Sequence, residues 1–186
     1  MHTLLFLEPG HFHATLTLRE PNPGVSDELF IYASDGAGPD VRDFLGLIDR
    51  FNGRVERPTR WRPVVVSDAD PLSRLHAERR GDVVVVAGRN GGKARMFRRL
   101  HEAGFHVLAD KPWLVEPEDL EPIRASLSGW PLLMEIMTGR HDVAAGLFKR
   151  LVDDREVFGD FRDDGTAIEL ASVHHLEKTV DGAPLR

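Results

Sequence analysis

The sequence of 186 residues contains no cysteine, which excludes disulfides, thiolate metal ligands and cysteine nucleophiles. Long apolar runs are also missing. No window approaches the roughly 20 apolar residues of a membrane span. The short run at 4–7 is followed at once by Glu8 and Pro9, so it lacks the longer apolar stretch of a secretory signal. We therefore expect a cytoplasmic protein without a membrane partner.

A basic excess is absent as well. Lys and Arg number 24 against 30 Asp and Glu, so the net charge is −6. Because general nucleic-acid binders carry the opposite balance, we expect no nucleic-acid partner. The remaining composition, 41% hydrophobic and 29% charged, is that of a globular protein and not of a disordered one. The length suits one domain plus the beginning of a second.

Short apolar runs alternate with amphipathic stretches along the chain. Several runs are continuously apolar, which is typical of parallel strands that are covered on both faces. The runs lie at 4–7, 28–33, 63–66, 82–87, 106–109 and 131–137, and the helix candidates at 39–51, 70–80, 92–103, 116–127 and 142–153. This alternation predicts an α/β fold with a doubly wound parallel sheet.

The first two predicted strands end in residues that suit a dinucleotide. The first runs into the turn 8–12, where Gly10 permits a tight turn, although Glu8 and His13 replace the outer glycines of the fingerprint G-x-G-x-x-G. Asp35 ends the second strand, near the spacing at which an acid binds the adenosine ribose of NAD and repels the extra phosphate of NADP. A plain strand-to-helix turn and an ordinary polar turn are the respective alternatives.

The fourth and fifth predicted strands also end in polar residues. The turn 88–92 is rich in glycine, which allows a cofactor to approach the backbone, and Asn90 in it can bind a ribose or amide group or cap the next helix. The fifth strand runs into Asp110, Lys111 and Pro112. The proline keeps Lys111 out of helical geometry, so its ammonium could share in proton transfer. A surface lysine paired with Asp110 is the alternative.

Two histidine pairs stand out among nine histidines. His11 and His13 are separated by one residue, and His174 and His175 are adjacent. Neither pair has the i, i+4 spacing and the carboxylate of a zinc-binding helix, so we expect no metal site. We place His11 and His13 at the mouth of a cofactor or substrate pocket, or at the cap of the first helix. An α/β enzyme whose histidine pairs bind a metal stays an alternative.

Four segments carry a family resemblance: FLEPGHFHATL, GDVVVVAGRN, HEAGFHVLADKPWLVEPEDL and PLLMEIMTGRHDVAAGLFKRLVDDREVFGDF. They resemble the phosphate turn, the fourth strand, the Glu-Lys-Pro region and the sixth strand with its crossing helix in the glucose–fructose oxidoreductase/inositol dehydrogenase (Gfo/Idh/MocA) family. The likeness covers almost the whole chain, and the Lys-Pro element is its most specific part. Asp110 replaces the family's Glu, and Gly88-Arg89 replaces Thr-Pro before Asn90.

The resemblance implies both a fold and an activity. The fold would be a Rossmann-type domain over residues 1–137, with strand order 3-2-1-4-5-6, followed over 138–186 by a crossing helix and the incomplete start of an α+β substrate domain. The activity would be NAD(P)-dependent hydride transfer on a sugar, cyclitol or related polyol. Lys111 would hold the substrate hydroxyl and ease the loss of its proton. The cofactor-binding residues would be Gly10, His11, Phe12, Asp35, Gly88, Asn90 and Asp110, with Asp35 favouring NAD over NADP.

The resemblance also implies an incomplete site. The family's second domain supplies a proton-transfer histidine in an Asp-x-x-x-His motif, which this sequence lacks, so we expect weak cofactor binding and no turnover by the chain alone. His174 and His175 are the candidates to replace that histidine. The strand expected at 166–180 would be mobile or would pair with a second copy of the chain. An inactive nucleotide-binding fragment and a non-enzymatic Rossmann-fold protein remain alternatives.

Overall fold

The computed structural model describes residues 1–127, 131–136, 142–160, 179–180 and 183–184. The chain divides into two compact units, Met1–Ile136 and Met137–Arg186. Each unit is described by itself.

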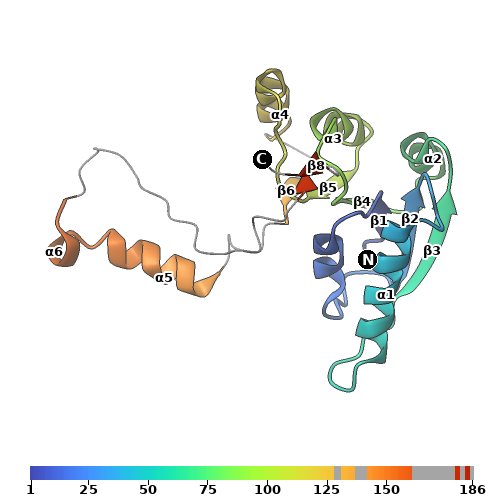
Figure 1. Cartoon of the computed structure of the whole chain (residues 1–186), viewed down its shortest axis with the longest axis horizontal. Coiled ribbons are helices and arrows are strands. Elements are labelled where there is room, and N and C mark those ends of the chain that lie inside the picture. Colours follow the sequence, from blue (N-terminus) through green and yellow to red (C-terminus); the bar gives the residue numbers. More distant parts are fainter. Residues whose placement is uncertain (128–130, 137–141, 161–178, 181–182, 185–186) are drawn as a thin grey trace. The chain divides into compact units, whose positions relative to one another are not determined.

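A six-stranded sheet forms the centre of the first unit (Figure 1). Its strands are β1 (Leu4–Leu7), β2 (Glu28–Ala33), β3 (Arg62–Ser67), β4 (Val83–Val86), β5 (His106–Ala109) and β6 (Leu133–Glu135). All neighbours are parallel and follow the order β3-β2-β1-β4-β5-β6. This order is that of a Rossmann fold and confirms the prediction. The order reverses between β1 and β4, and ligands of such sheets bind outside the carboxyl ends of the strands at that point.

Helical segments cover both faces of the sheet. They are η1 (Phe12–Leu18), α1 (Pro39–Gly53), α2 (Pro71–Glu78), α3 (Lys93–Glu102), η2 (Pro117–Asp119) and α4 (Leu120–Ser126). On one face, Leu5 and Leu7 of β1 belong to a core with residues of α2, α3 and α4. On the other, Leu4 and Phe6 belong to a core with residues of η1 and α1. Two buried faces explain why the strand sequences are continuously apolar.

The helical segment after β1 differs from a regular α-helix. It is a 3-10 helix of seven residues, Phe12–Leu18. The hydroxyls of Thr15 and Thr17 donate to the carbonyls of Phe12 and Ala14, three residues back, at 2.8 and 3.1 Å. Such local bonds compete with the α-helical ladder. The result is a short element that begins at Phe12, after the turn residue Gly10 and its neighbour His11.

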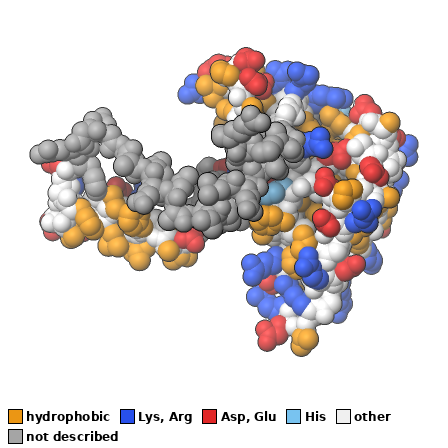
Figure 2. Space-filling model, in the orientation of Figure 1, with side chains coloured by type: hydrophobic (Ala, Val, Ile, Leu, Met, Phe, Trp, Pro, Cys, Tyr) orange, Lys and Arg blue, Asp and Glu red, His pale blue; other side chains and the backbone are white. Residues whose placement is uncertain are grey.

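The second unit contains α5 (Val143–Val152) and α6 (Arg155–Phe158), and a pairing of β7 (Thr179–Val180) with β8 (Ala183–Pro184). The predicted helix at 142–153 is present, and Asp142 caps it by accepting a hydrogen bond from the Ala145 amide at 2.8 Å. Figure 2 shows hydrophobic side chains gathered along α5. The predicted strand lies largely outside the described residues, and so do His174 and His175.

Candidate functional site

A crevice of about 480 Å³ opens at the carboxyl ends of β1, β2 and β4. Its walls come from the turns that follow these strands and from the amino-terminal end of α1. Gly10, Asp35 and Gly88, three of the residues predicted to bind a cofactor, lie in its lining. The crevice therefore occupies the switch point at which Rossmann folds hold a dinucleotide.

The turn after β1 has the backbone of a glycine-rich loop although it contains one glycine. Glu8, which stands in place of the first fingerprint glycine, has φ 47°, a left-handed conformation that favours glycine. Its backbone carbonyl lies so close to Gly88 that a Cβ there would be 2.5 Å from the Glu8 oxygen. Gly88 thus allows β1 and β4 to meet at the crevice floor.

The Glu8 carboxylate is held by the neighbouring strand end. Its Oε1 accepts a hydrogen bond from the Ser34 amide at 2.9 Å. Asp35 is exposed at the crevice edge, and its Oδ1 accepts from the Ala37 amide at 3.1 Å, so the polar-turn interpretation of Asp35 is correct as far as it goes. Asp40 adds a third carboxylate to the lining, and Arg89 a cation.

The first residue of α3 is a buried lysine that sequence reasoning missed. Lys93 is 1% exposed, and its ammonium donates to Asn90 Oδ1 at 3.0 Å and to the Asp110 carbonyl at 3.2 Å. The N-cap of α3 is Gly92, so Asn90 does not cap this helix. A signal was present in the sequence, because Lys93 precedes Phe97 and Leu100 at the spacing of the buried helix face.

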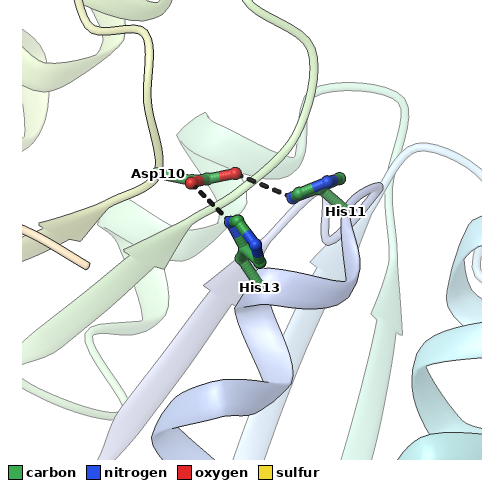
Figure 3. Close-up of side chains that lie close together, drawn as sticks. All are labelled: His11, His13 and Asp110. Atoms are coloured by element: carbon green, nitrogen blue, oxygen red, sulfur yellow. Dashed lines mark hydrogen bonds and ion pairs between the residues drawn. The ribbon is translucent and has the colours of Figure 1, made fainter. Parts of the chain in front are cut away.

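His11, His13 and Asp110 form a cluster beside the ends of β1 and β5 (Figure 3). His11 Nδ1 lies 2.8 Å from Asp110 Oδ2, and His13 Nδ1 lies 2.9 Å from Asp110 Oδ1. The Lys111 amide donates to the same Oδ1 at 2.9 Å. Both oxygens of Asp110 are therefore engaged by the protein, and the two histidines share one carboxylate.

The surroundings lower the pKa values of both Asp110 and His11. Burial by itself raises the pKa of the Asp110 carboxyl, but the hydrogen bond and charge of His13 and the charges of Lys111 and His11 outweigh it, so the pKa lies below its ordinary value. Burial lowers the pKa of His11, and the attraction of Asp110 only partly opposes this. A carboxylate beside a neutral His11 imidazole is therefore the favoured state near neutral pH.

Lys111 is exposed, next to this cluster. Within the described part of the chain, its ammonium makes no hydrogen bond or ion pair, so it does not pair with Asp110 as the surface-lysine alternative supposed. Phe12 is also exposed, at 60%, and lines a neighbouring cavity of about 600 Å³ between η1 and α1. The strand ends thus place Gly10, Asp35 and Gly88 in the crevice and His11 and Asp110 in the histidine cluster, whereas Phe12 lines the neighbouring cavity and Asn90 contacts Lys93.

No protein-family model and no curated protein matches the sequence. Among solved structures, a Parabacteroides merdae protein classed as an oxidoreductase is 37% identical over 99% of this chain, with a TM-score of 0.82. The chain carries the Gfo/Idh/MocA-like amino-terminal domain. This Gfo/Idh/MocA-like chain spans 43% of the length of that protein.

Two further structures share the fold of the Gfo/Idh/MocA-like domain. The WlbA dehydrogenase of Chromobacterium violaceum, solved with NADH and UDP-GlcNAcA, is 22% identical over 83% of this chain, with a TM-score of 0.56. The biliverdin reductase of Synechocystis, solved with biliverdin and NADP+, is 12% identical over 72% of this chain, with a TM-score of 0.50. The chain spans 40% and 36% of these two proteins. In the described residues, no helix has the length and apolar character needed to cross a membrane.

Proposed function

We propose that the chain binds NAD(P) in the crevice at the ends of β1, β2 and β4, as the cofactor domain of a hydride-transferring oxidoreductase. The observation that carries this proposal is the crevice itself, which combines a switch-point position, the close approach of Gly88 to Glu8 and an acid at the end of β2. The switch-point position and the acid after the second strand are features by which Rossmann sheets hold a dinucleotide. Related structures that hold NADH and NADP+ support the proposal.

Residues of the crevice and of the turns beside it have proposed roles toward the cofactor. Gly10, which lines the crevice, and the amides of His11 and Phe12, at the start of η1, would hold the pyrophosphate. Asp35 would bind the adenosine ribose. Gly88 would admit the cofactor to the backbone, and Asn90 would contact the nicotinamide ribose or amide.

The charge of the crevice bears on which cofactor it accepts. Glu8, Asp35 and Asp40 contribute carboxylates to the lining, against the single guanidinium of Arg89. A carboxylate repels phosphate groups, and NADP carries one more of these than NAD. We therefore propose a preference for NAD, with modest affinity.

The nicotinamide would supply hydride transfer to or from a carbon of a sugar, cyclitol or related polyol. Lys111 would hold the substrate oxygen and take part in its proton transfer, since its ammonium is exposed at the edge where β5 ends. Asp110 has both oxygens engaged by His11, His13 and the Lys111 amide. Its proposed role is therefore to orient those groups, in place of a direct contact with nicotinamide.

An inactive nucleotide-binding domain and a non-enzymatic protein are the competing functions, and two measurements separate them. Calorimetry of the chain with NADH tests binding, and a saturable heat of one equivalent is expected. Turnover is then measured as the reduction of NAD by the full-length protein in the presence of each member of a panel of polyols. Binding without turnover would favour the inactive domain, and no binding to a folded chain would contradict the proposal.

The role of Lys111 is tested in the same full-length protein. Lys111→Ala is expected to lower turnover by about 10²-fold or more, the usual scale for a general acid–base group, with cofactor affinity changed by no more than a few-fold. Lys149→Ala is the matched control, because Lys149 is an exposed lysine on α5. Equal turnover by the two variants would return Lys111 to the role of a surface lysine.

A further inference from the structure

The cluster of His11, His13 and Asp110 presents converging donor atoms to one point. Both histidines turn their Nδ1 atoms toward the same carboxylate (Figure 3). One donor atom from each of the three side chains lies within 4.8 Å of the other two. Metal–ligand distances for imidazole nitrogen and carboxylate oxygen are about 2.0–2.2 Å, so the donors of one ion lie within about 4.4 Å of one another. The three side chains need to move by only a few tenths of an ångström to meet this condition.

His11 carries the most telling feature of the cluster. Its Nδ1 is buried and has no hydrogen-bond partner in the described residues, although Asp110 Oδ2 is 2.8 Å away. That contact is an ion-pair contact whose angles fall outside those of a hydrogen bond, so the buried nitrogen has no well-aligned hydrogen-bond partner. An ion held between the nitrogen and the carboxylate would satisfy both groups. We propose that His11, His13 and Asp110 bind one divalent transition-metal ion.

The donor set decides which class of ion fits. Two imidazole nitrogens and one carboxylate oxygen suit Zn²⁺, Fe²⁺, Co²⁺ or Ni²⁺, whereas Ca²⁺ and Mg²⁺ prefer oxygen ligands. The chain has no cysteine to offer a thiolate. Three protein ligands leave at least one coordination position open, which is the arrangement of catalytic metal sites and not of closed structural ones.

The surroundings of Asp110 hold it in place as a ligand. Its side chain is 4% exposed, its Oδ1 accepts from the Lys111 amide at 2.9 Å, and its backbone carbonyl accepts from Lys93. Such outer contacts fix the orientation of ligands. The side chain of His13 is 13% exposed and that of His11 is 37% exposed. The ion would therefore enter from the His11 side, and its open coordination position would face solvent on that side.

The site goes beyond the proposed function, because dinucleotide binding at the crevice needs no metal. Of the three ligands, none lines the crevice between β1, β2 and β4. A bound ion with an open position would add a Lewis acid for an oxygen atom of a substrate, beside Lys111. The sequence pattern conceals the site, because the third ligand lies 97 residues after His13.

Metal titration of the chain tests the site. The probes are Co²⁺, followed by its visible absorption, and Zn²⁺, in competition with a chromophoric chelator. We expect one equivalent of either ion to bind. We also expect His11→Asn and His13→Asn to weaken binding by about 100-fold or more, since loss of outer-shell contacts alone costs 10–100-fold. His2→Ala is the control, because it removes an exposed histidine that pairs with Asp82 and is not part of the cluster, and it should bind the metal as wild type does.

The outcomes separate cleanly from those of the proposed function. Asp110→Asn is also titrated with metal, and a urea unfolding curve shows whether this variant is folded. If it is not, His11→Asn still tests the site. His11 is the most exposed of the three ligands, so its replacement should disturb the fold least. Absence of stoichiometric binding, or binding that survives both single histidine substitutions, would overturn the metal site. Calorimetry with NADH on the metal-free chain is scored separately, so either proposal can fail alone.

Discussion

Lys93 donates a hydrogen bond from its ammonium to the backbone carbonyl of Asp110, 3.2 Å away, and so ties the start of α3 to the end of β5. The same ammonium donates to Asn90 Oδ1. A 1% exposed lysine thus links two of the turns that form the candidate site. The link connects the crevice turn after β4 with the histidine cluster.

Replacing this lysine should destabilise the fold. Lys93→Met keeps the length of the side chain but leaves the Asp110 carbonyl and the Asn90 amide oxygen without this donor. A buried polar group that loses a hydrogen bond costs about 1–3 kcal/mol, so loss of the bond to the Asp110 carbonyl should lower the free energy of unfolding in urea by that order. Lys111→Met, at an exposed position, should stay within about 0.5 kcal/mol of wild type. Equal stability of the two variants would contradict this role of Lys93.

Because the chain after β4 passes close to the chain after β1, adding a methyl group at Gly88 should destabilise the fold. A Cβ at Gly88 would lie 2.5 Å from the Glu8 backbone oxygen, so Gly88→Ala must displace the backbone. We expect it to lower the free energy of unfolding by about 1–3 kcal/mol, the usual cost of overpacking. Gly46→Ala is the matched control. A Cβ at Gly46 of α1 meets nothing within 4 Å, so this helix substitution should stabilise by about 0.5–1 kcal/mol.

Much of the fold follows from the sequence, because apolar runs such as 83–86 are buried on both sides, which is typical of parallel strands covered by helices. The 3-10 helix after β1 does not follow, since its form depends on hydroxyl contacts of Thr15 and Thr17 that compete locally with the α-helix. The burial of Lys93 was concealed by the general expectation that lysine is exposed.

The sequence predicts which residues lie near the site but not the contacts of the two histidines with Asp110. Parallel strands bring their carboxyl ends to one edge, so Gly10, Gly88 and Asp110 could be expected near one another. The sequence could not reveal that His11 and His13 both turn toward Asp110, because that depends on the backbone of the turn after β1. There, the left-handed Glu8 redirects the chain before Gly10.

His76 should make stability depend on pH. Its ring stacks on Phe105 with centroids 5.7 Å apart. Burial, with the charges of Arg99 and Arg79, holds the pKa of His76 below its ordinary value of 6.5, and Asp70 opposes this only in part. Below pH 6.5 the unfolded chain therefore binds more protons than the folded one, and the free energy of unfolding falls as pH is lowered.

The measurement is a set of urea unfolding curves from about pH 7 to about pH 5, the range in which an ordinary histidine titrates. His76→Gln removes the titrating group, so its free energy of unfolding should fall less steeply with decreasing pH than that of wild type. Parallel pH dependences of the two proteins would show that His76 does not contribute.

Asp35 should set the cofactor preference. Its carboxylate at the crevice edge favours a ribose hydroxyl and repels a phosphate in the same place. We expect tighter binding of NADH than of NADPH, and we expect Asp35→Ala to narrow the difference. Asp49→Ala, which removes an exposed carboxylate from α1, should leave the preference unchanged. Tighter binding of NADPH by wild type would overturn the assignment.

The central claim is that a dinucleotide occupies the crevice at the ends of β1, β2 and β4. Amide chemical shifts of the isotopically labelled chain, recorded during titration with NADH, test it most directly because they report both binding and place. The account predicts that the amide chemical shifts of Gly10, Asp35 and Gly88 change and reach a plateau as NADH is added. The amide shifts of α5 should not change in parallel with them. A folded chain whose crevice amides do not move at saturating NADH, or whose saturable shifts lie elsewhere, would contradict it.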